Sequence, residues 1–203
     1  MTIHFVYGAI VAIIFSYLAG SLSSAIIVCK LARLPDPRAQ GSKNPGATNV
    51  LRIGGKKLAA IVLLGDALKG FIPVLVAGYV LSIPVASWCA LAAFLGHLFP
   101  IFFGFKGGKG VATALGTWFA LDWRLGLLAV LVWLIVAYMT RYSSLAAITM
   151  VLVVFASPLY STPGYLTPVI SIPLMCLILL WTHRHNIQRL LAGTEPKIGS
   201  EKK

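Results

Sequence analysis

Acidic residues are the scarcest charged class in this sequence. Only five carboxylates stand against 17 lysines and arginines in 203 residues, which gives a formal net charge of +12. A cage of carboxylate metal ligands, or a pair of catalytic carboxylates, is hard to build from so few. We therefore expect no metal and no cofactor. The five are Asp36, Asp66, Asp122, Glu195 and Glu201.

Cysteine and the common catalytic motifs are also scarce or absent. Cys29, Cys89 and Cys176 are an odd number in or beside apolar runs, so we interpret them as buried free thiols. No histidine is followed five residues later by aspartate, which excludes the His–Asp acyltransferase motif. The GxSxG nucleophile elbow is missing, as are the P-loop pattern and a GxGxxG after a strand.

Hydrophobic residues dominate what is present. They make up 59% of the chain, only 11% is charged, and the mean hydropathy is +0.90. Apolar runs near the length of a bilayer span recur throughout, as in polytopic helical membrane proteins. We predict an all-α integral membrane protein that forms a single domain over residues 1–203. Its spans are expected near 4–28, 57–80, 84–103, 110–121, 124–140, 144–159 and 165–183.

Seven spans is the expected count, or six if a short one is re-entrant. The fourth and sixth are short for about 30 Å of hydrocarbon, so we expect them to be tilted, broken or shielded by neighbours. The first cation is Lys30, so the N-terminus lacks the basic segment of a cleavable signal peptide. Residues 5–28 are therefore expected to stay as a transmembrane helix.

Most of the lysines and arginines lie in the predicted loops on one side of the membrane. All but two of the 17 lie there, the exceptions being Lys69 within a span and Arg124 in an opposite loop. By the positive-inside rule that side is cytoplasmic, which puts the N-terminus in the periplasm and the C-terminus in the cytoplasm. Such loop cations argue against nucleic acid as a partner. We expect polar substrates to arrive from the cytoplasm, and residues 198–203 to form a disordered tail.

A stretch rich in glycine and lysine follows the third span. Lys106 and Lys109 bracket Gly107 and Gly108, and Gly110 precedes another predicted helix. Backbone N–H groups freed by glycines and by a helix N-terminus favour an anion, and two ammonium groups add positive charge. We interpret it as a phosphate-binding loop at a membrane face. The alternative is a basic turn whose lysines contact lipid headgroups.

A second polar stretch, GSKNPGATNVLR at residues 41–52, follows the first span. It offers neutral hydrogen-bonding groups and a guanidinium, Arg52, that can hold a phosphate through two bonds. A solvated turn in which Thr48 or Asn49 caps a helix is the alternative. The candidate substrate-binding residues of the two stretches are Gly41, Asn44, Gly46, Thr48, Asn49, Lys106, Gly107, Gly108 and Gly110.

Other polar groups fall within or beside the spans. Asp66 and Lys69 share a helix face, so we expect an ion pair inside the bundle, equally compatible with a structural role and a substrate contact. We interpret His97, alone in an apolar helix, as making a structural hydrogen bond. His183 and Asn186 share one helix face at the end of the last span.

Six segments, in this order, resemble one family. They read GSLSSA at 20–25, GSKNPGATNVLR at 41–52, GDALKG at 65–70, GHLFPIFFGFKGGKGVAT at 96–113, YSSL at 142–145 and HRHNIQRL at 183–190. The sequence resembles the bacterial acyl-phosphate:glycerol-3-phosphate acyltransferases, the PlsY family. The resemblance implies a seven-helix inner-membrane enzyme with its active site on the cytoplasmic side.

The resemblance also implies a reaction, the first step of phospholipid synthesis. A fatty acyl group would pass from acyl phosphate to the sn-1 hydroxyl of glycerol 3-phosphate, giving 1-acylglycerol 3-phosphate (lysophosphatidate) and inorganic phosphate. Lys43 departs from the family pattern, which more often has glycine there, and its side chain is penalised if the backbone needs a positive φ. Matching positions imply the catalytic residues Ser42, Arg52, Lys109, Ser144, His183 and Asn186.

An acyl phosphate is already activated, so its enzyme need only hold two phosphates together and screen their repulsion with cations. The departing phosphate would take the hydroxyl proton itself, and His183 as general base is the competing hypothesis. We expect the acyl chain in a groove open to membrane lipid. A soluble enzyme that produces acyl phosphate is the one protein partner considered. The alternative functions are a transporter of a phosphorylated anion and a structural membrane subunit.

Overall fold

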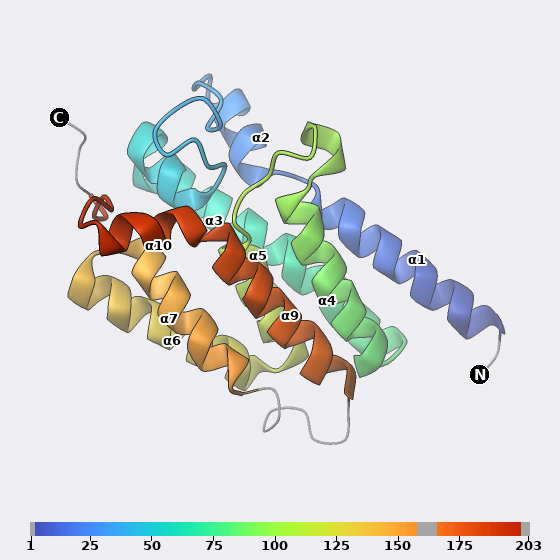
Figure 1. Cartoon of the computed structure of the whole chain (residues 1–203). Helices are drawn as coiled ribbons and strands as arrows, with labels where there is room; N and C mark the ends of the chain where they lie inside the picture. The colour runs from blue at the N-terminus through green and yellow to red at the C-terminus, as the bar shows by residue number, and fades with distance from the viewer. Residues whose placement is uncertain (1–2, 158–165, 200–203) are drawn as a thin grey trace.

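The computed structural model describes residues 3–157 and 166–199, and the regular structure in them is entirely helical (Figure 1). This confirms the all-α prediction. Cys29, Cys89 and Cys176 are free and buried, as predicted. The helices are α1 (Ile3–Gly20), α2 (Ser24–Leu31), α3 (Ala47–Val80), α4 (Ile83–Leu98), α5 (Val111–Leu121), α6 (Trp123–Thr140), α7 (Ser143–Phe155), α9 (Leu166–Thr182) and α10 (Arg184–Leu191), with a 3₁₀ turn, η1, at Ile101–Phe103.

Several of these helices can cross a membrane. Four stretches of the described residues are long and apolar enough: α1, α3, α4 with η1, and α6. The α9–α10 pair makes a fifth if it counts as one span bent by 54°. The helices α5 and α7 have 11 and 13 residues, fewer than the roughly 20 of a full span, in line with the predicted short fourth and sixth spans. The total of seven spans stays a prediction.

The first predicted span is wrong in one respect. Instead of one helix over 4–28, α1 ends at Gly20 and α2 starts at Ser24. The Ser21 hydroxyl donates back to the Tyr17 carbonyl (2.8 Å), the kind of bond by which serine competes with a helix ladder. The spans predicted from residue 84 onward agree with α4–α9 within a few residues, except that 158–159 and 165 lie outside the described residues. The span predicted at 57–80 ends with α3, but α3 starts earlier, at Ala47, and its helical backbone is broken at Gly55 (φ +80°).

Helix α4 is the centre of the bundle. It contacts α1, α3, α5 and α9, and Phe94 on it is fully buried together with Trp118 of α5 and Met175 of α9. By contrast, α1, α3 and α6 carry many exposed large hydrophobic side chains, such as Phe15 and Leu134. An apolar outer surface of this kind is what a bilayer solvates.

Helices α3 and α5 pack closely enough to exclude side chains. A Cβ at Gly116 would overlap the Ala67 carbonyl oxygen, and one at Gly70 would overlap that of Thr113. Small residues let membrane helices approach to backbone contact. This contact fixes the start of α5, and the glycine-rich loop before it, against α3.

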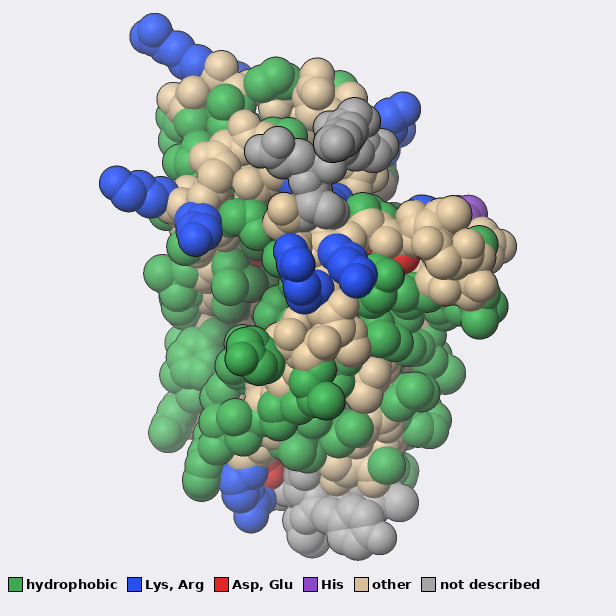
Figure 2. Space-filling model, turned by 90° about the vertical axis from the view of Figure 1, so that its left-hand side faces the viewer, with side chains coloured by type: hydrophobic (Ala, Val, Ile, Leu, Met, Phe, Trp, Pro, Cys, Tyr) green, Lys and Arg blue, Asp and Glu red, His purple; other side chains and the backbone are tan. Residues whose placement is uncertain are grey.

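The polar loops gather at one end of the bundle, which is the upper end in Figure 1, whereas α1 begins at the opposite end. Figure 2 shows most Lys and Arg side chains of one face collected in its upper part, above a belt of hydrophobic groups. The loops also bond to one another: Arg38 donates to the Phe103 carbonyl (2.9 Å) and Arg141 to that of Ile198 (3.1 Å). Of the tail predicted to be disordered, Ile198 and Gly199 are described and residues 200–203 lie outside the described residues.

Lys43, at the position where the family more often has glycine, has a left-handed backbone with φ of +57°. Because a Cβ is penalised there and glycine is not, we predict that Lys43→Gly raises the free energy of unfolding by about 1 kcal/mol. Lys43→Ala, which keeps a Cβ at the same backbone position, should leave it nearly unchanged. Denaturant unfolding in detergent measures both, and a loss of stability in Lys43→Gly would contradict the prediction.

Candidate active site

A cavity of about 620 Å³ opens at the polar end of the bundle. Helices α3, α5, α6, α7 and α10 and the first polar loop contribute to its wall. Within the described part of the chain, His, Cys, Asp and Glu form no cluster that could hold a metal ion. All six predicted catalytic residues line this one cavity: Ser42, Arg52, Lys109, Ser144, His183 and Asn186.

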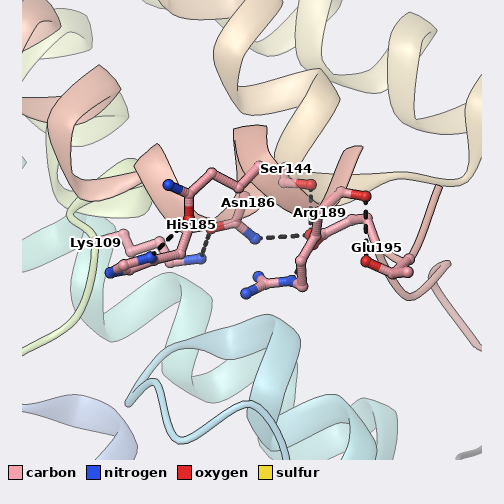
Figure 3. Close-up of polar contacts among 8 residues, drawn as sticks. Lys109, Ser144, His185, Asn186, Arg189 and Glu195 are labelled. Atoms are coloured by element: carbon pink, nitrogen blue, oxygen red, sulfur yellow. Dashed lines mark hydrogen bonds and ion pairs between the residues drawn. The ribbon is translucent and has the colours of Figure 1, made fainter. Parts of the chain in front are cut away.

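Lys109 is a partly buried cation on the cavity wall. Its Nζ donates to Asn186 Oδ1 of α10 (Figure 3). Burial lowers the pKa of Lys109 to about 8, although the charge of Glu195 opposes that shift while Arg189 and Arg52 add to it. An ammonium whose proton is this weakly held needs an anionic partner, which is what a bound phosphate supplies.

The turn into α5 aims backbone donors at the same cavity. Gly110, at φ +92°, is the N-cap of α5, and a Cβ there would overlap the ring of Phe94. Gly110, Val111 and Ala112 all line the cavity. The first N–H groups of a helix have no partners within it, so this N-terminus favours an anion.

The glycines before Lys109 play a different part from the one predicted. The N–H of Gly107 donates to the Leu98 carbonyl (3.1 Å) and that of Gly108 to the His97 carbonyl (3.2 Å). Neither glycine lines the cavity, and their amides are already engaged. The prediction that these amides bind phosphate is therefore wrong. Lys106 is exposed and also lies outside the lining, as does Gly41.

Asn49 organises the first polar loop. Its Oδ1 accepts from the Ser42 N–H (2.8 Å), and its Nδ2 donates to the carbonyls of Pro37 (2.8 Å) and Gln40 (3.0 Å). The Asn49 side chain is thus engaged by the loop, although it borders the cavity with Asn44, Gly46 and Thr48. Its effect is to hold Ser42 at the rim.

Two neighbouring serines at the start of α7 face different partners. Ser143 shares a hydrogen bond with Thr48 (3.2 Å), which joins α7 to the start of α3. Ser144 donates to Glu195 (2.6 Å) and is nearly buried. Both line the cavity, and Ser144 is the one predicted to act in it.

His183 lies at the 54° bend between α9 and α10. Its Nδ1 is 2.8 Å from the Leu179 carbonyl, a contact that places the ring proton on Nδ1 and leaves Nε2 as an acceptor. Burial, reinforced by the charge of Lys109, lowers the pKa of His183 to about 4. The imidazole is therefore neutral near pH 7.

Glu195 is the residue that sequence reasoning missed. It follows α10, and its carboxylate accepts from Ser144, from Asn186 Nδ2 (2.7 Å) and from Arg189 Nε (2.7 Å), as Figure 3 shows. Burial alone would raise the pKa of Glu195, but these hydrogen bonds and the charge of Arg189 hold it below its ordinary value. Glu195 therefore stays ionised and joins three side chains of the site.

Comparison with known proteins gives one consistent result. The family model for glycerol-3-phosphate acyltransferase matches residues 10–193. Relatives of that name from Francisella tularensis subsp. holarctica and Vibrio cholerae are each 52% identical, over 94% and 96% of this chain and 93% of theirs. The chain belongs to the glycerol-3-phosphate acyltransferase family. A crystal structure of PlsY (YgiH), an integral membrane glycerol 3-phosphate acyltransferase, in its glycerol 3-phosphate form has a TM-score of 0.89 at 42% identity, covering 95% of this chain and 96% of that one.

Membership in this family confirms the resemblance seen in the sequence. It identifies the chain as a glycerol-3-phosphate acyltransferase embedded in a membrane, and so decides against a transporter or a structural subunit. The segment that was expected to bind phosphate does face the first polar loop, because Gly108 lies against the Pro45 carbonyl. If this segment had pointed away from the first polar loop, Ser42 and Lys109 could not line the same cavity.

The pKa of Lys109 sets an expected pH dependence for this acyltransferase. The lysine is protonated below about pH 8 and neutral above it, and only the protonated form attracts a phosphate. We predict that kcat/KM for glycerol 3-phosphate falls about tenfold per pH unit on the alkaline side of that value. Initial rates from about pH 7 to about pH 10, corrected for ionisation of the substrate, measure it. A flat profile across the range would contradict the prediction.

Proposed function

We propose that this acyltransferase moves a fatty acyl group from acyl phosphate to the sn-1 hydroxyl of glycerol 3-phosphate. The products are 1-acylglycerol 3-phosphate and inorganic phosphate. The observation that carries the proposal is the composition of the cavity, which combines several cations with an outlet toward an apolar groove. The cations would hold the two phosphates, and the apolar groove would hold the acyl chain.

The first need is to hold two phosphates side by side. Arg52, Lys109 and Arg189 contribute positive charge to the cavity wall, and Glu195 offsets part of it. Phosphates repel one another strongly unless cations stand between them, and charges act more strongly in a site that excludes water. The hydroxyls of Ser42 and Ser144 and the N-terminus of α5 add donors around them.

The second need is a place for the acyl chain. A smaller apolar cavity of about 360 Å³ lies between α3, α5 and α6. An unbranched acyl chain would leave the polar cavity along this groove and reach the lipid-facing surface. Five residues line both cavities and so connect them: Ala60, Leu63, Ala112, Leu115 and Val130.

The neighbouring PlsY structures support both needs. One is of a glycerol 3-phosphate form and the other, 41% identical with a TM-score of 0.87, is of a lysophosphatidic acid form. The same fold thus binds a small phosphorylated alcohol and the molecule that results when an acyl chain is added to it. Acyl phosphate as the donor is our own inference.

The proposed chemistry needs no strong base. The sn-1 oxygen attacks the acyl carbonyl carbon, the bond from that carbon to the phosphate oxygen breaks, and the departing phosphate takes the hydroxyl proton. With a pKa of about 4, His183 is a weak base near pH 7. Its Nε2 can still accept a hydrogen bond from the attacking hydroxyl and orient it. This favours catalysis assisted by the substrate over His183 as general base.

We also infer where the reaction takes place. The end of the bundle that carries the cations and the cavity would face the cytoplasm, with the N-terminus in the periplasm, in a bacterial inner membrane. Acyl phosphate and glycerol 3-phosphate would both enter there. The same basic face is the one open to a soluble enzyme that produces acyl phosphate.

The donor is tested with purified protein in detergent. We predict that acyl phosphate and glycerol 3-phosphate together release inorganic phosphate, and that acyl-CoA does not replace acyl phosphate. Lys109→Ala should lower kcat/KM by roughly 10²–10³-fold or more, because a preorganised charge at the reacting phosphate is lost. Lys56→Ala, which removes an exposed lysine outside the cavity, is the matched control. Near-normal turnover by Lys109→Ala would refute the phosphate-binding role.

The groove is tested by filling it. Ala60 is exposed and lines both cavities, so Ala60→Phe should narrow the acyl path without disturbing the core. We predict a KM for long-chain acyl phosphate that rises about tenfold, with a smaller effect on short chains. The adjacent Ile61 is exposed and lines neither cavity, which makes Ile61→Phe the control. Equal effects of the two substitutions would rule out this path.

A further inference from the structure

Three ionisable side chains lie beneath the cavity without a role in the proposed chemistry. Asp66 and Lys69 of α3 form an ion pair (Oδ1–Nζ 2.8 Å), and His97 of α4 approaches the same carboxylate (Nδ1–Oδ1 3.7 Å). All three side chains are at most 7% exposed. Charges are expensive in the middle of a membrane bundle, so a cluster kept there calls for an explanation.

Lys69 ties this cluster to the break between the first two helices. Its Nζ donates to the carbonyl of Leu22 (2.6 Å), which lies between the end of α1 and the start of α2. Lys69 thus balances the charge of the Asp66 carboxylate, and its second bond, to Leu22, holds that ion pair in place. Asp66 Oδ1 faces Nδ1 of His97 at 3.7 Å, which is too long for a hydrogen bond, so the carboxylate acts on the ring through its charge and through packing. Both residues border the cavity, whereas Lys69 does not.

The other side of the His97 ring supports the glycine-rich loop. A Cβ at Gly108 would overlap His97 Nε2, so the imidazole packs directly on that backbone. Main-chain hydrogen bonds also hold the loop against the end of α4. The carbonyl of His97 accepts from the N–H of Gly108 (3.2 Å), and that of Leu98 from the N–H of Gly107 (3.1 Å). Lys109 is the next residue. Its position over the cavity therefore depends on what holds the ring of His97.

We propose that Asp66 and His97 are positioning residues for Lys109: the carboxylate fixes the imidazole, and the imidazole supports the turn that carries the lysine. This assigns a role to the GDALKG segment and to the two glycines whose amides do not bind phosphate. The prediction that His97 makes a structural hydrogen bond is wrong, because its buried Nδ1 has no hydrogen-bond partner among the described residues. The inference rests on the proposed function, because it takes Lys109 to be the cation that holds a phosphate.

The test uses His97→Gln, which keeps a polar group but removes the ring. The rate at which acetic anhydride modifies Lys109, followed by mass spectrometry as a function of pH, reports the pKa of Lys109 without any turnover. Glu195, Arg189 and Arg52 face this lysine and are unchanged in the variant. We expect the pKa of Lys109 to rise by ~1 unit from about 8 as the lysine leaves its buried position. The KM for glycerol 3-phosphate should rise ~10-fold, with a smaller change in kcat.

Ser87→Ala is the matched control, because Ser87 is a fully buried polar residue of the same helix that bonds only to the Ile83 carbonyl in the described structure. It should leave both the modification profile and the KM as they are. If His97→Gln resembles Ser87→Ala in both readouts, the cluster has no positioning role and the inference is overturned.

A second variant guards against misfolding. Asp66→Asn combined with Lys69→Met removes both charges together, which buried ion pairs tolerate better than the loss of one partner. It should give the same change in the pKa of Lys109 as His97→Gln. If neither variant yields folded protein, the cluster supports the whole fold and the inference fails. If the variants change the pH profile of Lys109 modification but the unmutated protein does not turn over acyl phosphate, only the proposed function is contradicted.

Discussion

A positive charge buried at the edge of a membrane bundle is the interaction on which the rest of this structure depends. Lys109 is partly buried, and this burial weakens its hold on its proton until the pKa falls to about 8. Asn186 accepts its hydrogen bond, and Glu195 supplies an opposing charge. An ammonium kept in that condition binds an incoming anion strongly, because the phosphate restores the charge balance that burial removed.

Much of the fold can be understood as the means of holding that lysine. Gly107 and Gly108 let the loop lie on the end of α4, and Gly110 lets it turn into α5 against the ring of Phe94. The bend after α9 brings Asn186 to the lysine from the opposite wall. Glu195 folds back from the chain end to join Ser144, Asn186 and Arg189. Segments far apart in the sequence thus meet around one charge.

The sequence predicted the parts of this arrangement that follow from local composition. Apolar length located most of the helices, and the segments that resemble the family supplied the six predicted catalytic side chains that line the cavity. The end of α1 at Gly20 was not predicted, although Gly20, Ser21, Ser23 and Ser24 interrupt the apolar run there. Local composition does not reveal that Lys69, far along the sequence, bonds to the backbone at this break.

The errors at the site also arise because contacts between residues distant in sequence are not visible in local composition. Glycine signals that a backbone must turn or approach closely, but not toward what, so the amides of Gly107 and Gly108 were assigned to phosphate when they bind α4. Glu195 was missed because its position depends on how the chain folds back after α10. One signal could have found it: in a chain with five acids, a carboxylate nine residues after Asn186 is rare enough to examine.

The most direct measurement is a crystal structure with glycerol 3-phosphate and an unreactive phosphonate analogue of acyl phosphate bound together. We predict both phosphorus groups in the one cavity, with Lys109 or Arg52 about 3 Å from an oxygen of each. The acyl chain should follow the groove between α3, α5 and α6. A structure with the two phosphorus groups in separate sites, or with Lys109 facing neither, would contradict the claim that shared cations bring the reactants together.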